Sequence, residues 1–218
     1  MNKLLLSAAA VLSLSALTPL ASAQDAKAGE KKAAMCIGCH GIPGYQASFP
    51  EVHRVPMISG QNAKYIGAAL AAYKKGDRKH PTMRAIAGSL NDQDMADLAA
   101  FYELHGKDDG GAPPDTPTVQ PSPQVAELLK KANCSSCHGA NYNKPIDPSY
   151  PKIAGQHADY LYVALKAYHG GAAGPIGRNN AIMAGMAKQY TLPELKLIAR
   201  YIGSLDGELK TVPQSRFR

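Results

Sequence analysis

Apolar residues recur three or four positions apart in several stretches of this chain, which is the spacing of a buried helix face. One stretch begins at Gln61 or Asn62, either of which can cap a helix, and runs to Tyr73, with Gly76 just beyond its end. A matching stretch spans residues 158–168. No segment alternates apolar and polar residues with the period of a strand, so the sequence predicts an all-α fold.

Four further stretches carry helix signals. Residues 26–35 and 125–132 are rich in helix-forming residues, mainly Ala and Lys in the first stretch. The last helix of each half of the chain is predicted to follow Asn91 or Thr191, and Thr191 with Glu194 matches a capping box.

These elements occur in the same order twice. The segment 56–66 recurs as 151–161, with proline first, a Gly-Gln pair in the middle and tyrosine near the end. Farther on, Met83-x-x-Ile86 recurs as Met183-x-x-Met186. Because the order of these landmarks is kept, we interpret the chain as a tandem duplication of one helical unit.

Composition marks the boundaries of the two units. Residues 1–23 combine a basic start, an apolar run and a small-x-small site, so we expect a signal peptide that is cleaved near Ala23 and export to the periplasm. Residues 106–123 are rich in Pro and Gly and are predicted to be a linker. The linker separates unit one, residues 24–105, from unit two, residues 124–218.

A Cys-x-x-Cys-His signature occurs once in each unit, at residues 36–40 and 134–138. Cysteines three residues apart on a helical turn lie on one side, where both sulfurs can bond the two vinyl groups of one haem. The cysteines predicted to hold two covalent haem c groups are Cys36, Cys39, Cys134 and Cys137. The following histidines, His40 and His138, are predicted to bind the two irons.

Three other interpretations of the cysteines compete with haem attachment. They are a redox dithiol, which needs a βαβ setting that this sequence does not predict, structural disulfides and zinc binding. None of them requires a histidine directly after the second cysteine in both copies, whereas haem attachment does. A thin core supports haem as well, because the chain has no Trp and only three Phe.

The second axial position of each iron is predicted to be taken by methionine. Met83 and Met183 occupy equivalent places, more than forty residues after each histidine, in what we expect to be a loop before the final helix. Met57 is matched by Lys152, which argues against it. We expect the usual role of methionine, filling the core, for Met35, Met95 and Met186.

The other histidines are not matched by a histidine in the other unit, and we expect most of them on the surface or in loops. They are His53, His80, His105, His157 and His169. His80 shares the expected loop of Met83, but Pro81 and the repeat favour the methionine. Coordination by histidine and methionine saturates the iron and favours a high potential, which suits electron transfer.

The two haem signatures, the duplicated Gly-Gln-x-x-x-Tyr segment (Gly60 to Tyr65 and Gly155 to Tyr160) and the paired methionines resemble the cytochrome c4 family. The resemblance implies two class I cytochrome c-like domains related by a pseudo-twofold axis, with haems facing each other. It also implies a periplasmic dihaem carrier that delivers electrons to a terminal oxidase. Unit one departs from the repeat by an insertion at residues 49–55.

The sequence thus predicts a one-electron carrier of a respiratory chain with no catalytic residues. Its expected partners are redox proteins, namely a membrane-bound donor complex and a terminal oxidase or other acceptor. An alternative is the cytochrome subunit of a dehydrogenase complex, for instance beside a flavoprotein. A dihaem enzyme is less favoured, since both units offer a methionine and no cysteine is left over.

The charge of the chain is uneven. Residues 24–105 hold 10 basic and 8 acidic side chains, whereas residues 124–218 hold 12 and 6. Unit two is therefore predicted to be steered toward an acidic partner patch, with ordinary solubility as the competing explanation. No basic and aromatic array indicates nucleic acid, and a loose association with a membrane surface stays open.

Overall fold

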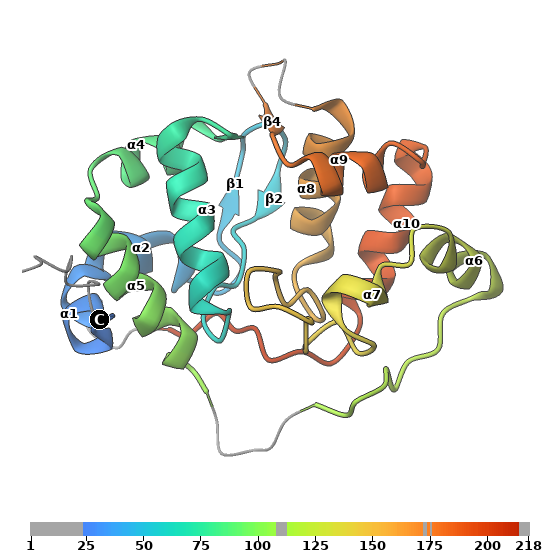
Figure 1. The fold of residues 1–218 in the computed structure, drawn as a ribbon, viewed down its shortest axis with the longest axis horizontal. Helices are drawn as coiled ribbons and strands as arrows, with labels where there is room; N and C mark the ends of the chain where they lie inside the picture. Colours follow the sequence, from blue (N-terminus) through green and yellow to red (C-terminus); the bar gives the residue numbers. More distant parts are fainter. Residues whose placement is uncertain (1–23, 108–112, 172–173, 175, 214–218) are drawn as a thin grey trace, which may run out of the picture.

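The computed structural model describes residues 24–107, 113–171, 174 and 176–213. The expected signal peptide lies outside these residues. The chain forms two helical lobes side by side, one from each unit (Figure 1). Each lobe has its own cluster of buried apolar side chains. The all-α prediction is confirmed, with four two-residue strands added to it.

Unit one contains five helices and three short strands among its described residues. They are α1 (Ala26–Lys32), α2 (Ala34–His40), β1 (Gln46–Ala47), β2 (His53–Arg54), α3 (Ala63–Lys75), β3 (Arg78–Lys79), α4 (Pro81–Gly88) and α5 (Asp92–Leu104). Helix α3 ends as expected at Gly76, whose φ of 90° is left-handed. The Asn62 side chain does not cap α3, because it donates to the Tyr150 carbonyl of unit two.

Unit two repeats this plan with one strand. Its elements are α6 (Pro123–Lys131), α7 (Ser135–His138), α8 (Ala158–Gly170), β4 (Gly177–Arg178), α9 (Ala181–Ala187) and α10 (Leu192–Gly203). The predicted capping box of Thr191 and Glu194 begins α10. Asn91 and Asp94 form the same device at α5, which explains why both final helices begin where the sequence indicates.

Strand pairing relates the two units by an approximate twofold axis. Strands β3 and β4 pair antiparallel, with Arg78 opposite Arg178, so equivalent residues of the repeat face each other. Strands β1 and β2 form a hairpin that includes the insertion of unit one and lies between α3 and α8 (Figure 1). This hairpin reaches unit two, where Arg54 forms an ion pair with Asp159 at 3.1 Å.

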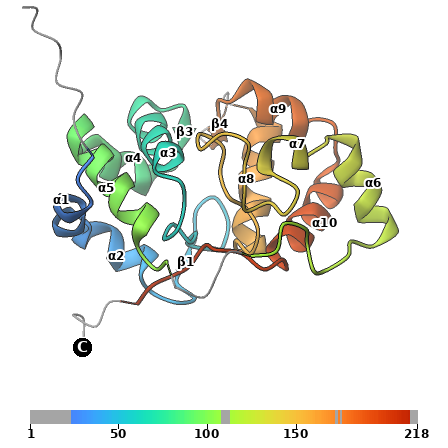
Figure 2. The ribbon, with the colours of Figure 1, turned by 60° about the horizontal axis from the view of Figure 1, so that its bottom comes forward.

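The end of the chain crosses back from unit two to unit one. It runs along the lower edge of both lobes in Figure 2. Lys210 forms an isolated bridge with Ser59, and its N–H donates to the Ser59 carbonyl at 3.1 Å. Glu208 accepts a hydrogen bond from Lys152. None of the described helices is long and apolar enough to cross a membrane.

Candidate functional site

Each Cys-x-x-Cys-His signature lies on a short helix. Cys36, Cys39 and His40 are on α2, whereas Cys134 is the residue that precedes α7 and Cys137 lies within it. All four cysteines are free and half-buried, so they form no disulfide. The helical turn places both sulfurs of a pair on one side, as thioether bonds to one porphyrin require.

The two histidines share one hydrogen-bond pattern. His40 Nδ1 lies 2.8 Å from the Pro56 carbonyl oxygen, and His138 Nδ1 lies 2.9 Å from that of Pro151. A carbonyl only accepts, so Nδ1 carries the proton and Nε2 is the basic nitrogen that can bind a metal. Burial lowers the pKa of both imidazoles, which favours the neutral form that iron requires.

Met83 and Met183 lie in helices, not in the loop that the sequence indicated. Each is the third residue of its helix, α4 or α9, and each is half-buried. The residue before each helix caps it through a bond to the methionine N–H. His80 Nδ1 accepts that bond at 3.4 Å, and Asn180 Oδ1 accepts its counterpart at 2.9 Å. The two methionines therefore have matched local structure.

His80 caps α4 and also acts electrostatically on His40. Its imidazole contributes to lowering the pKa of His40, after the larger effect of burial. Among the described residues, no hydrogen bond joins Met83 to His40 or Met183 to His138.

Two of the three expectations about methionine burial were wrong. Met35 and Met186 are 49% and 37% exposed and do not fill the core, whereas Met95 does. His53 is buried, with its ring 6.2 Å from that of Tyr160 in unit two. The insertion brings His53 into the seam between the units, a position that local sequence does not reveal.

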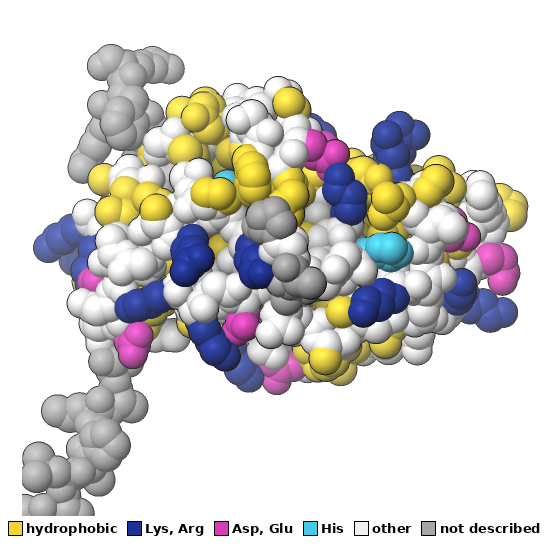
Figure 3. Space-filling model, turned by 90° about the horizontal axis from the view of Figure 1, so that it is seen from above, with side chains coloured by type: hydrophobic (Ala, Val, Ile, Leu, Met, Phe, Trp, Pro, Cys, Tyr) yellow, Lys and Arg dark blue, Asp and Glu magenta, His cyan; other side chains and the backbone are white. Residues whose placement is uncertain are grey.

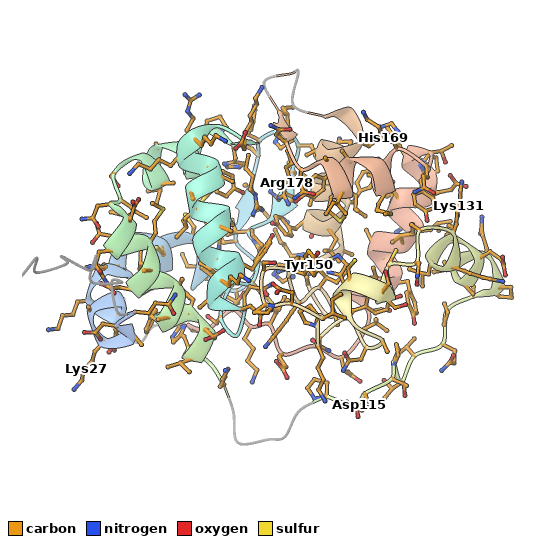
Figure 4. All side chains as sticks on the ribbon, viewed as in Figure 1. Lys27, Asp115, Lys131, Tyr150, His169 and Arg178 are labelled. Carbon is orange, nitrogen blue, oxygen red and sulfur yellow. The ribbon has the colours of Figure 1, made fainter. Side chains whose placement is uncertain are left out.

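Two arginines lie at the seam between the units, and neither was predicted from the sequence. Arg78 stacks over Tyr73 at 4.7 Å, and Arg178 stacks over Tyr168 at 5.3 Å, which is the equivalent pair. Figure 4 shows Arg178 between the two lobes. Each arginine precedes its methionine by five residues, and this shared spacing is the signal that could have revealed them.

The arginine pair lacks an anionic partner among the described residues. Arg78 is 7% exposed, and its Nε has no hydrogen-bond partner there. The hydroxyl of Tyr160 accepts from both arginines, at 3.4 Å from Arg78 and 3.0 Å from Arg178. Burial opposes ionisation of this phenol, but the two guanidiniums outweigh burial and lower the pKa of Tyr160 to about 8.

These observations fit a group that carries carboxylates. Two cations side by side, of which Arg78 is buried and Arg178 is half-buried, are costly unless they are paired with negative charge. Haem has two propionates on the edge opposite its vinyl groups, and guanidinium binds carboxylate well. The free cysteines, the neutral histidines and the unpaired guanidinium together define a c-type cytochrome with one haem site in each unit.

Comparison with known proteins agrees with this class. The family model described as "Cytochrome c" matches residues 26–103 and again 123–206. Cytochrome c4 of Azotobacter vinelandii is 30% identical, over 94% of this chain and 100% of that protein. The crystal structure of reduced cytochrome c4 from Pseudomonas stutzeri superposes with a TM-score of 0.62 at 26% identity, covering 84% of this chain and 100% of the other. The chain belongs to the cytochrome c4 family.

A relative with another name is also similar. The "Thiosulfate dehydrogenase electron acceptor" of Stutzerimonas stutzeri is 29% identical, over 81% of this chain and 82% of that protein.

Membership of the cytochrome c4 family makes this chain a dihaem electron carrier with two covalently bound haem c groups, as the two signatures predict.

Proposed function

We propose that this protein is an exported, periplasmic one-electron carrier of a respiratory chain. In this proposal His40 and Met83 bind one haem iron, and His138 and Met183 bind the other. The matched position of the two methionines carries the proposal, since both are the third residue of equivalent helices whose N–H groups are bonded by the preceding residue.

The proposed ligands suit electron transfer. When bound, each haem supplies a one-electron iron couple. Histidine and methionine would together hold each iron, and a thioether favours the reduced state more than a second imidazole does. The chain itself keeps the histidine protonated at Nδ1 through the Pro56 or Pro151 carbonyl, and the arginines would pair with the propionates of a bound haem.

Arg78 and Arg178 would hold the propionates of the two haems. Pairing would satisfy the free Nε of Arg78 and balance the excess positive charge at the seam. Because β3 pairs with β4, the two guanidiniums lie together, so carboxylates of both haems would meet at the boundary between the units.

The expected partners are a membrane-bound donor complex and a terminal oxidase. The face seen in Figure 3 has lysine and arginine side chains spread over it among apolar ones. Two of the exposed apolar residues are Ile182 and Met186, on the helix that carries Met183. Such a surface suits a partner with an acidic rim around an apolar centre.

A second function has one observation in its favour. The similar protein named as a thiosulfate dehydrogenase electron acceptor supports the interpretation that this chain serves a substrate dehydrogenase. Both functions use the same haem chemistry, so they differ only in the donor. Electron transfer from a purified thiosulfate dehydrogenase, measured against that from a membrane donor complex, distinguishes them.

Mass and optical spectroscopy test the proposed ligands. The exported protein should carry the mass of two haems, and its ferric spectrum should show the weak long-wavelength band of sulfur bound to iron. Met83→Ala and Met183→Ala should each remove half of this band and lower one potential, by on the order of 0.1 V. Binding of carbon monoxide by the reduced wild-type protein would contradict the proposal, since it requires an open iron.

A further inference from the structure

Two buried glutamines exchange contacts across the seam. Gln61 of unit one contacts the backbone of Lys152 in unit two, donating to its carbonyl at 2.9 Å and accepting from its N–H at 2.9 Å. Gln156 of unit two makes the same two bonds with the backbone of Met57 in unit one. It donates to the Met57 carbonyl at 2.8 Å and accepts from the Met57 N–H at 3.0 Å. Both glutamines are 4% exposed, so water has little access to these bonds.

The peptide group that each glutamine contacts also serves a haem histidine. His40 donates to the carbonyl of Pro56, and the N–H of that same peptide belongs to Met57, which donates to Gln156. In unit two, His138 donates to Pro151, and the N–H of Lys152 donates to Gln61. Each histidine is thus joined through one peptide to a glutamine of the opposite unit.

Hydrogen bonds arranged in such a chain strengthen one another. An acceptor at the N–H of a peptide makes its carbonyl oxygen more negative, so the carbonyl accepts a stronger bond from the imidazole. A histidine that donates a stronger Nδ1 bond gives more electron density to its metal. More donation stabilises the ferric state and lowers the potential.

We propose that Gln61 and Gln156 are crossed positioning residues, each setting the electron donation of the iron-bound histidine in the opposite unit. This inference rests on the histidine ligation of the proposed function, and it adds a coupling between the units that needs no direct contact between the haems. Each Oε1 also accepts a hydrogen bond from the backbone N–H of the residue that follows the glutamine, Asn62 or His157. This bond holds the side-chain amide in one orientation.

The test exchanges each glutamine for leucine in the dihaem protein and measures both potentials, with the haem signals assigned by paramagnetic NMR. Gln156→Leu should raise the reduction equilibrium of the haem on His40 roughly threefold, about 28 mV at 59 mV per tenfold change. Gln61→Leu should do the same for the haem on His138. The Nδ1 proton of the affected histidine should shift in each case.

Asn62→Ala is the matched control. It removes another contact across the seam, the 3.1 Å bond to the Tyr150 carbonyl, without touching a peptide that a histidine uses. Figure 4 shows Tyr150 at the boundary between the lobes. Both potentials should stay unchanged in this variant. Gln61→Ala and Gln156→Ala take the place of a leucine variant that does not fold.

A shift in the glutamine's own unit, or an equal shift of both haems, would overturn the crossed arrangement. Unchanged potentials with an intact seam would overturn it as well. Failure of the proposed ligands looks different, because the sulfur band would then be missing from the wild-type spectrum whatever the glutamine variants show.

Discussion

The two units pack their first helix on their last in different ways. In unit one, α1 lies so close to α5 that a Cβ on Gly29 would be 2.1 Å from the Asp97 carbonyl oxygen. In unit two, α6 turns Val125, Leu128 and Leu129 into the core instead. Both solutions hold the helix that precedes the cysteines, one by close backbone approach and the other by apolar side chains.

The apolar cores of the two units also differ in size. Unit two has the larger cluster of buried apolar residues, which includes three tyrosines and seven Leu or Ile side chains. The cluster of unit one is smaller and contains three alanines. Unit one also buries a charge, Asp97, where the repeat gives unit two Leu197. The duplication therefore preserved the fold while the means of stabilising it diverged.

Loss of haem should show the largest difference in stability between the two units. Cys36→Ala with Cys39→Ala removes the covalent attachment in unit one, and Cys134→Ala with Cys137→Ala does so in unit two. Unit one should lose its stability, on the order of 5 kcal/mol, and exchange its amide protons as an unfolded chain does. Unit two should keep partial protection in α8 and α10, because its apolar cluster is larger.

Hydrogen exchange followed by mass spectrometry reads each unit separately. The intact haem in the other unit serves as the internal control. Equal loss of protection in the two variants would show that core size does not decide how far a unit depends on haem.

Gly29→Ala should have the next largest effect. The added methyl would meet the Asp97 carbonyl oxygen and, at 2.8 Å, the Phe101 Cβ, so α1 must move away from α5. We expect a loss of about 3 kcal/mol in unit one. Glu127, counted back from the first cysteine, occupies the equivalent place in unit two and is exposed.

Glu127→Ala is therefore the control, and its effect should stay within about 0.5 kcal/mol. Amide exchange in α1 and α5 gives the unit-one value, since a two-unit protein need not unfold in one step. Similar small losses in both variants would mean that α1 tolerates displacement and that the close approach is incidental.

Asp97→Leu tests the buried charge by giving unit one the residue of unit two. The carboxylate accepts from Lys32 Nζ at 2.8 Å, from the Asp25 N–H at 3.0 Å and from Gln93 Nε2 at 2.6 Å. Leucine would leave the Asp25 N–H without its partner, and we expect a loss of about 2 kcal/mol near neutral pH.

The pH dependence of the free energy of unfolding tests whether the ionised form of Asp97 is the stabilising one. The hydrogen bond from Lys32 is the main cause that lowers the pKa of Asp97 from 3.8. The stabilisation is therefore present above pH 3.8 and is lost as the pH falls through the lowered native value. Asp97→Leu should remove this acid step. Leu197→Asp, with a carboxylate that lacks these partners, should show the reverse, gaining stability on acidification.

The sequence predicts the parts of this molecule that depend on local signals. Capping boxes, helix faces and the haem signatures all act within a few residues, so the helices near 62–75, 92–104 and 192–203 could be placed. The sequence predicts loops where the short helices carry Met83 and Met183, because a short helix begun by His80-Pro81 or Asn180 gives little apolar periodicity.

The contacts between the units could not be predicted. The partners of Gln61 and Gln156 lie 91 and 99 residues away in the chain, and a repeated Gly-Gln pair does not say what the amide binds. The return of the chain end to Ser59 and the burial of His53 depend likewise on how two lobes meet. Only the equal spacing of Arg78 and Arg178 from the methionines was available as a hint.

Arg54→Ala should have the smallest effect, although it breaks a contact that only unit one supplies. The ion pair of Arg54 and Asp159 joins the inserted hairpin to α8, but the two side chains are 41% and 35% exposed. Exposed pairs contribute less than about 1 kcal/mol and weaken with salt. The difference in thermal midpoint between Arg54→Ala and wild type should therefore shrink when salt is added. Lys64→Ala removes a more exposed ion pair with Asp147, so its thermal midpoint should differ from wild type by even less. If Arg54→Ala instead altered both haem potentials at all salt concentrations, the inserted hairpin, and not only the symmetric glutamines, would influence the haems across the seam.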